Sequence, residues 1–323
     1  MIENLEKRIF EVENQNFEEL ALEIFQFQVE NCPVYKNFVH ALNRPKPTKI
    51  EEIPFLPIDF FKLYDILSTT EKTELLFLSS GTTQQTRSKH HVLKAKMYEE
   101  SFLESYENFS GELENQVILA LLPNYLEQGN SSLVYMVERL IKETKNELSG
   151  FFKNDFSSLL ENYEKAISIG KKVVIFGVSY ALLDLAEQKP NLSKALIIET
   201  GGMKGRRKEL SKSELHAILK EAFLCDFISS EYGMTELLSQ AYSDKDEIFE
   251  LPNWMKILIR DTNDPFSFLP ESKTGGINVI DLANIYSCSF IATQDLGQIS
   301  NKGLKLMGRF DNADIRGCNL MVE

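Results

Sequence analysis

The chain has 323 residues, of which 43% are hydrophobic and 26% are charged, as in an ordinary globular protein with a substantial core. Its net charge of −13 argues against an extended nucleic-acid surface and against binding to anionic membranes. A small anionic ligand is compatible with this charge, because a local basic pocket can oppose the global field.

The cysteines and the first residues predict a cytoplasmic protein with reduced thiols. Four cysteines and four histidines are scattered without a C-x-x-C pair, which argues against a zinc site. The chain starts M-I-E-N-L-E-K-R, which is charged and lacks the apolar core of a signal peptide. No apolar run reaches the length of a membrane span.

The first part of the chain, about residues 1–70, is expected to be helical and to pack on the rest. Residues 16–31 have the period of an amphipathic helix, whose apolar face consists of Phe17, Leu20, Ala21, Ile24 and Phe25. Prolines at 45, 47, 54 and 57 then exclude a continuous helix.

The middle of the chain alternates short apolar runs with helical patterns, which predicts an α/β fold with mostly parallel strands. The runs expected to form buried strands are 75–78, 117–122, 173–176, 195–198 and 225–229. Ser211 and Glu214 have the spacing of a capping box, so a helix is expected from there to Phe223. Parallel sheets bind ligands at the carboxyl ends of their strands, so the loops after these runs are expected on one rim.

The loop after the first of these runs reverses the acidic character of the chain. Residues 79–98 contain no Asp or Glu, although the chain has 48 acidic residues against 35 Lys and Arg. The segment begins S-S-G-T-T and continues with the cations Arg87, Lys89, Lys94 and Lys96. The backbone N–H groups and hydroxyl groups of this loop could bind phosphates, and a solvated turn is an equal alternative. The loop is not the P-loop of nucleotide-binding NTPases, because the chain has no G-x-x-x-x-G-K-[ST] motif.

Two later loops have related features. Residues 201–208 (G-G-M-K-G-R-R-K) contain four cationic side chains and no acidic one. This segment is either an anion-binding site or a basic face beside a helix. Residues 229–236 (S-S-E-Y-G-M-T-E) are expected between a strand and a helix. There Glu236 is a candidate ligand for Mg²⁺, Tyr232 could offer its ring to a base, and Thr235 could offer its hydroxyl to a phosphate.

Together with 293–297 (T-Q-D-L-G) and 308–311 (G-R-F-D), these loops resemble the ordered motifs of the adenylate-forming superfamily. That superfamily includes acyl-CoA synthetases, peptide-synthetase adenylation domains and firefly-type luciferases. Five ordered motifs are far more specific than any one of them. The resemblance implies one domain over 1–323, which is the large N-terminal domain of that fold, with mostly parallel sheets flanked by helices and without the small mobile C-terminal domain.

A closer resemblance is to the Lux-type (LuxE-like) acyl-protein synthetases, which in bacterial luminescence activate a fatty acid for reduction to aldehyde. It is carried by residues 54–62 (P-F-L-P-I-D-F-F-K), by S-S-G-T-T with the following R-S-K-H-H, by 122–135 (L-P-N-Y-L-E-Q-G-N-S-S-L-V-Y), and by 308–321 (G-R-F-D-N-A-D-I-R-G-C-N-L-M). It covers most of the chain after about residue 15.

The resemblance implies that ATP and Mg²⁺ convert a carboxylic acid into an acyl-adenylate and pyrophosphate. The residues implied to hold the phosphates are Ser79, Ser80, Gly81, Thr82 and Thr83, and those implied to bracket the adenine are Gly201, Gly202 and Tyr232. Arg87 is expected to replace a lysine that usually ends the first loop in the superfamily, since this chain reads Q-Q-T-R-S there.

The remaining implied residues contact the α-phosphate, the metal and the ribose. Thr235 would contact the α-phosphate, and Glu236 would bind Mg²⁺. Asp295 would accept hydrogen bonds from the ribose hydroxyls with the help of Arg309. Taken alone, Asp295 is also compatible with a turn cap before Gly297; within the motif series the ribose role is the better interpretation.

Cys318 is the candidate nucleophile. Gly317 beside it permits unusual backbone conformations, and Arg309 and Arg316 could lower the thiol pKa and so favour the thiolate. The acyl-protein synthetases form an acyl-thioester on a cysteine near the C-terminus, and Cys318 is the residue that matches. The alternative is a buried cysteine that acts as a small hydrophobe, which fits the other three cysteines better.

The sequence therefore predicts an acid-thiol ligase, which activates a carboxylic acid, expected to be a fatty acid, and passes the acyl group to a protein cysteine. One alternative is a ligase that loads CoA or a carrier protein. Another is a catalytically weak module that binds an acyl-adenylate or a reductase. The expected partners are the acid and either an acyl reductase or an acyl-carrier protein.

Overall fold

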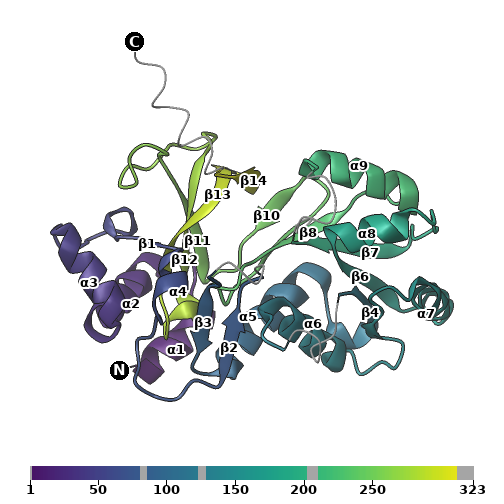
Figure 1. The fold of residues 1–323 in the computed structure, drawn as a ribbon, viewed down its shortest axis with the longest axis horizontal. Coiled ribbons are helices and arrows are strands. Elements are labelled where there is room, and N and C mark those ends of the chain that lie inside the picture. Colours follow the sequence, from purple (N-terminus) through teal and green to yellow (C-terminus); the bar gives the residue numbers. More distant parts are fainter. Residues whose placement is uncertain (1, 81–85, 123–128, 202–209, 311–323) are drawn as a thin grey trace, which may run out of the picture. The chain divides into compact units, whose positions relative to one another are not determined.

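The structure is a computed structural model that describes residues 2–80, 86–122, 129–201 and 210–310. The chain divides into two compact units, whose elements are labelled in Figure 1. The first unit consists of Met1–Leu75, Gln84–Lys94 and Glu250–Glu323, and the second of Leu76–Thr83 and Ala95–Phe249. The single domain expected over 1–323 stays a prediction.

The second unit contains a sheet with parallel central strands in the order β9-β8-β7-β6-β4-β5, with β10 beside β9. The strands are β4 (Gln116–Leu121), β5 (Gly150–Phe151), β6 (Lys172–Val178), β7 (Ala195–Thr200), β8 (Ser229–Tyr232), β9 (Ala241–Ser243) and β10 (Ile248–Glu250). The neighbours from β5 to β8 pair in parallel, whereas β8 and β9 are antiparallel. Every residue of β4 is buried, as expected for a strand that is covered on both faces.

Helices precede or connect these parallel strands and cover both faces of the sheet. They are α5 (Ala95–Ser110), α6 (Ser132–Glu143), α7 (Phe156–Ser168), α8 (Ser179–Ala186) and α9 (Lys212–Phe223), with a short 3₁₀ turn, η2 (Leu113–Asn115). Figure 1 shows α8 and α9 on one face and α5 and α6 on the other. The predicted capping box is confirmed, because the side chains of Ser211 and Glu214 satisfy each other's backbone N–H groups at the start of α9.

The expected strands at 117–122, 173–176 and 195–198 are confirmed as β4, β6 and β7. The strand expected at 225–229 starts later, because pairing with β7 begins only at Ser229, opposite Ile198. The run at 75–78 does form a strand, β2 (Leu75–Leu78), but it is absent from the parallel order given above. Its Leu76 is 38% exposed, so the expectation of a fully buried strand was wrong there.

The first unit contains an antiparallel sheet that the sequence analysis did not predict. Its strands follow one another as β11 (Met255–Arg260), β12 (Gly275–Asp281), β13 (Phe290–Ser300) and β14 (Gly303–Arg309). A short strand, β1 (Leu56–Pro57), pairs with β13 in parallel. A further strand of this unit, β3 (Lys89–Val92), follows the first acid-free loop.

The N-terminal helices pack within the first unit. They are α1 (Ile2–Phe10), α2 (Phe17–Asn31), α3 (Pro33–Leu42) and α4 (Phe60–Leu63), with 3₁₀ turns η1 (Ile50–Glu52) and, later in the chain, η3 (Leu282–Asn284). The amphipathic helix expected at 16–31 is confirmed as α2, and its predicted apolar face is buried. The buried Gln28 of α2 donates to the carbonyls of Asn284 and Ile285, which anchors this helix to the chain around η3.

The α/β class is confirmed. Among the described residues, no helix combines the length and the apolar character that crossing a membrane requires.

Candidate functional site

The carboxyl edge of the parallel sheet in the second unit gathers several predicted site residues. β7 ends at Thr200, directly before Gly201, and β8 ends at Tyr232, before the turn with Thr235 and Glu236. Because β7 and β8 are parallel neighbours, these segments leave the sheet at the same edge (Figure 1). This is the edge at which open α/β sheets bind ligands.

Two glycines lie at this edge, Gly201 for its backbone conformation and Gly233 for the side chain packed against it. Gly201 has a φ of 69°, a left-handed conformation that side chains disfavour. At Gly233 a Cβ atom would lie 2.4 Å from Oε1 of Glu231, so any larger residue would displace that carboxyl group. At both glycines, therefore, no side chain covers the main chain where the strand ends. The predicted partner Gly202 lies outside the described residues.

Tyr232 is buried at the end of β8. Its ring contacts the edge of Phe249, with 6.0 Å between the ring centroids, and only 6% of the residue is exposed. The predicted contact between Tyr232 and adenine stays a prediction.

Thr235 and Glu236 lie in a turn, in which the N–H of Leu237 donates to the carbonyl of Met234. The expectation of a helix after this turn was wrong: the chain returns as β9, antiparallel to β8. Glu236 is 5% exposed, and its carboxylate is a hard oxygen ligand of the kind that Mg²⁺ prefers. Among the described residues, no three His, Cys, Asp or Glu side chains form a group that could hold a metal ion.

A buried carboxylate, Glu199, lies just before this edge and was missed by the sequence analysis. It accepts hydrogen bonds from Oγ of Ser179 at 2.6 Å, from Oγ of Ser230 at 3.0 Å and from Nζ of Lys212 at 3.0 Å. Burial opposes ionisation of Glu199, but the nearby His216 ring at 3.9 Å, the charge of Lys212 and the hydrogen bond from Ser179 lower its pKa to about 2. Glu199 is thus an ionised carboxylate in the interior.

A second carboxyl group, that of Glu231, has a raised pKa, in contrast to Glu199. It is hydrogen-bonded to the hydroxyl of Thr200, which links the ends of β7 and β8. Its enclosure, followed by repulsion from Glu199, raises the pKa of Glu231 to about 7. The two carboxyl groups therefore differ in protonation at mildly acidic pH.

The first predicted phosphate loop is described only at its beginning. Ser79 and Ser80 follow β2, whereas Gly81, Thr82 and Thr83 lie outside the described residues. The N–H of Leu78 donates at 2.8 Å to the carbonyl of Asn130, in the connection that leaves β4 at the carboxyl edge. Ser79 therefore starts beside that connection.

The cations after this loop have carboxylate partners within the first unit, which the sequence analysis did not foresee. Lys89 lies 3.3 Å from Asp65, and Lys94 lies 2.6 Å from Glu6. These two lysines are therefore poor candidates for an anion site. Arg87 is exposed, and its predicted role stays a prediction.

Asp295 and Arg309 come together in the first unit. They are directly opposite each other on β13 and β14, and Nε of Arg309 lies 2.9 Å from Oδ1 of Asp295. Asp295 is within a long strand, so the turn-cap alternative is wrong. Its side chain is 12% exposed and that of Arg309 is 72% exposed, so an acidic acceptor is presented beside a largely solvated arginine.

Two motifs that are far apart in the sequence also meet in this unit. β1 lies within residues 54–62 and pairs with β13, which contains residues 293–297. Nε2 of Gln294 donates to Oδ2 of Asp59 at 2.7 Å, and Lys62 holds the other oxygen of Asp59 at 2.6 Å. This contact fixes the strand position next to Asp295.

Cys318 lies outside the described residues. Of the other cysteines, Cys32 and Cys288 are fully buried, and burial raises the pKa of both thiols. Burial also raises the pKa of the partly buried Cys225. Raised pKa values reduce the thiolate fraction, so these three thiols fit the structural role that the sequence suggested.

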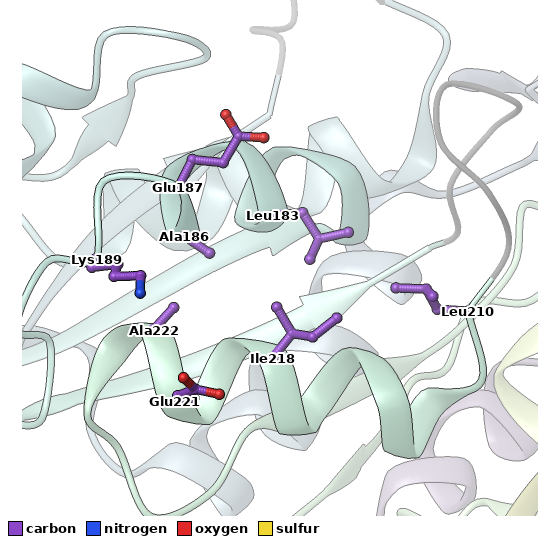
Figure 2. A pocket seen from close by; sticks show the side chains of 8 residues that line it. All are labelled: Leu183, Ala186, Glu187, Lys189, Leu210, Ile218, Glu221 and Ala222. Carbon is purple, nitrogen blue, oxygen red and sulfur yellow. The ribbon is translucent and has the colours of Figure 1, made fainter.

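A groove of about 540 Å³ lies between α8 and α9 (Figure 2). It is lined by Leu183, Ala186, Glu187, Lys189, Leu210, Ile218, Glu221 and Ala222. None of the predicted site residues is among them. We therefore assign the candidate site to the sheet edge and not to this groove.

No protein-family model matches the chain, and no curated protein matches its sequence significantly. Solved structures do match. A 2-hydroxyisobutyryl-CoA ligase in a postadenylation state aligns with a TM-score of 0.66 at 11% identity, over 95% of this chain and 70% of the ligase. ATP-bound MatB from Rhodopseudomonas palustris aligns with a TM-score of 0.53 at 18% identity, over 74% and 49%. The amide bond synthetase McbA from Marinactinospora thermotolerans gives 0.51 at 18%, also over 74% and 49%.

The chain is similar to these ligases in fold, and its match spans about half the length of MatB and of McbA. The fold expectation is thereby confirmed: the chain has the fold of the large domain of adenylate-forming enzymes. The Lux-type resemblance stays a prediction.

Proposed function

We propose that this protein is an ATP-dependent ligase that converts a carboxylic acid into an acyl-adenylate. The observation that carries the proposal is the placement of Gly201, Tyr232, Thr235 and Glu236 at one carboxyl edge of a parallel sheet. The fold supports it, because similar structures were solved with ATP or with an acyl-AMP bound.

In the proposed reaction, a carboxylate oxygen of the acid attacks the α-phosphorus of ATP. The bond from that phosphorus to the bridging oxygen breaks, and pyrophosphate leaves. Glu236 would hold Mg²⁺, which supplies positive charge to the phosphates as the leaving group forms. Thr235 would donate its hydroxyl to the α-phosphate, a preorganised contact where charge develops.

The nucleotide would be held by backbone and by polar side chains. The bare main chain at Gly201 and Gly202 and the ring of Tyr232 would bracket the adenine. Residues 79–83 would donate to the phosphates, with Arg87 supplying a cation. Asp295 would accept hydrogen bonds from the ribose hydroxyls, and Arg309, its present ion-pair partner, would assist there.

We further propose that the acid is a fatty acid and that the acyl group passes to Cys318 in the cytoplasm, for use by an acyl reductase or a carrier protein. The thiolate would attack the acyl carbonyl and AMP would leave. The raised pKa values of Cys32, Cys225 and Cys288 support this choice of nucleophile. The second candidate is transfer to CoA, which is favoured by the likeness to a CoA ligase.

Pyrophosphate exchange with a panel of carboxylic acids tests the first half-reaction. Radiolabelled acyl transfer then separates the two acceptors. Cys318→Ser is expected to adenylate normally but to accumulate no hydroxylamine-sensitive acyl-enzyme, because the hydroxyl is a far weaker nucleophile than a thiolate. Cys225→Ser is the matched control and should load normally. Full loading of Cys318→Ser would exclude Cys318 as the acceptor.

A further inference from the structure

The polar network around Glu199 joins three successive strand ends of the second unit. Glu199 is on β7 and pairs in register with Gly177 of β6 and with Ser230 of β8. Ser179 begins α8 immediately after β6, and its Oγ lies 2.6 Å from Glu199 and 3.1 Å from the carbonyl oxygen of Gly201. One hydroxyl therefore contacts both the buried carboxylate and the backbone of the proposed adenine-binding segment.

Lys212 adds a cation to the network from the start of α9. It is the first residue of α9, where the capping box of Ser211 and Glu214 fixes the start of the helix. Its Nζ lies 3.0 Å from Glu199 and 2.8 Å from Oγ of Ser230. Lys212 and Glu199 are thus held against β8 two residues before Tyr232.

The location of the network is unusual for a purely stabilising ion pair. The Glu199 side chain is 4% exposed and that of Lys212 is 27% exposed. Burying the carboxylate costs desolvation energy that the attraction of one cation often fails to recover, so the ion pair is weak evidence for stability alone. The strand order reverses between the neighbours β4 and β6. After β4 the chain adds β5 towards one edge of the sheet, and after β6 it adds β7 in the opposite direction. Ligands of open α/β sheets bind at such a switch point, where Ser179 lies.

We propose that Glu199, Ser179 and Lys212 are positioning residues for the nucleotide, which hold the ends of β6, β7 and β8 in the geometry that binds ATP. This inference rests on the proposed function. The three side chains act through the backbone of Gly201 and through β8, so their loss displaces the binding groups without removing any of them.

Ser179→Ala is the principal test, because it removes one hydroxyl and leaves the ion pair intact. ATP affinity, measured by calorimetry without turnover, is expected to fall about tenfold, which is the typical effect of losing a hydrogen bond to a charged group. Ser179→Thr keeps the hydroxyl and should restore the affinity. Lys212→Met removes the partner of a buried carboxylate and should weaken ATP binding further.

Gln116→Ala is the matched control, since Gln116 belongs to a buried polar network at the opposite end of the same sheet. Its side chain bonds Tyr106 and the carbonyls of Ser110 and Gly111, at the amino end of β4. This variant should lose thermal stability but keep the wild-type affinity for ATP. Equal ATP affinity of Ser179→Ala and the wild type, or equal losses in Ser179→Ala and Gln116→Ala, would overturn the inference.

The same experiment separates the two proposals. A wild-type protein without ATP binding and without acid-dependent pyrophosphate exchange would overturn the proposed function and the inference together. A wild type that binds ATP and exchanges pyrophosphate, with Ser179→Ala unchanged, would overturn the positioning role alone.

Discussion

Replacing Glu231 by glutamine is expected to remove a pH-dependent destabilisation of this protein. The carboxyl group of Glu231 is enclosed by the second unit and hydrogen-bonded to Thr200. Enclosure raises its pKa from 4.5 to about 7, the carboxylate of Glu199 adds repulsion, and Thr200 and Lys212 oppose the rise. Tyr98 and Tyr242 also face it. Glutamine keeps the shape and a hydrogen-bonding oxygen but carries no titrating proton.

The direction follows from proton linkage. Below pH 4.5 Glu231 is protonated in the folded and the unfolded chain, so its ionisation costs no stability. Between pH 4.5 and 7 the unfolded chain ionises first, and stability is lost as the pH rises. The full loss, reached above pH 7, is about 3 kcal/mol at ~1.4 kcal/mol per pH unit.

Urea unfolding at several pH values between 4.5 and 8 measures the effect. The free energy of unfolding of Glu231→Gln minus that of the wild type should grow across this range and level off above pH 7. Glu164→Gln, which changes an exposed carboxylate on α7, controls for the loss of one acidic group and should show no such growth. A difference for Glu231→Gln that is independent of pH would refute the reasoning.

Two further predictions concern the candidate site. Glu236→Gln should keep the fold but lose most adenylation, because a neutral amide is a poorer Mg²⁺ ligand than a carboxylate; unchanged acid-dependent pyrophosphate exchange would exclude the metal role. Asp295→Ala should weaken ATP binding by roughly 10- to 100-fold, as expected for loss of a charged acceptor, and should change the melting temperature little, because its ion pair with Arg309 is largely exposed. An unchanged ATP affinity with a lower melting temperature would contradict the ribose assignment.

The sequence by itself determined the local elements whose residues interact with near neighbours. Apolar runs that end in small residues identified β4, β6 and β7, because a strand that is buried on both faces has few polar positions. The pair Ser211 and Glu214 identified the start of α9, because a capping box is formed within one turn of chain. The order of the motifs identified the adenylate-forming fold, which the similar structures confirm.

Charge patterns along the sequence were less informative, because ion pairs join residues that are distant in the chain. The acid-free segment after Ser79 suggested a cluster of available cations, yet Lys94 is paired with Glu6 from the N-terminal helix. The ion pair of the buried Glu199 with the partly exposed Lys212 likewise has no local signature, since it forms only when β7 and α9 pack together.

The tertiary structure alone decided the remaining features. The antiparallel sheet from β11 to β14 was not predicted. Its β12 is fully buried and lacks the alternation of polar and apolar residues that identifies half-exposed strands, whereas β11 alternates in burial. The turn after Tyr232 leads into β9 and not into a helix, because β8 requires a partner on its free side, and β9 supplies it. Asp295 and Arg309 face each other because the register of β13 and β14 sets them opposite, and register depends on pairing between strands and not on either strand alone.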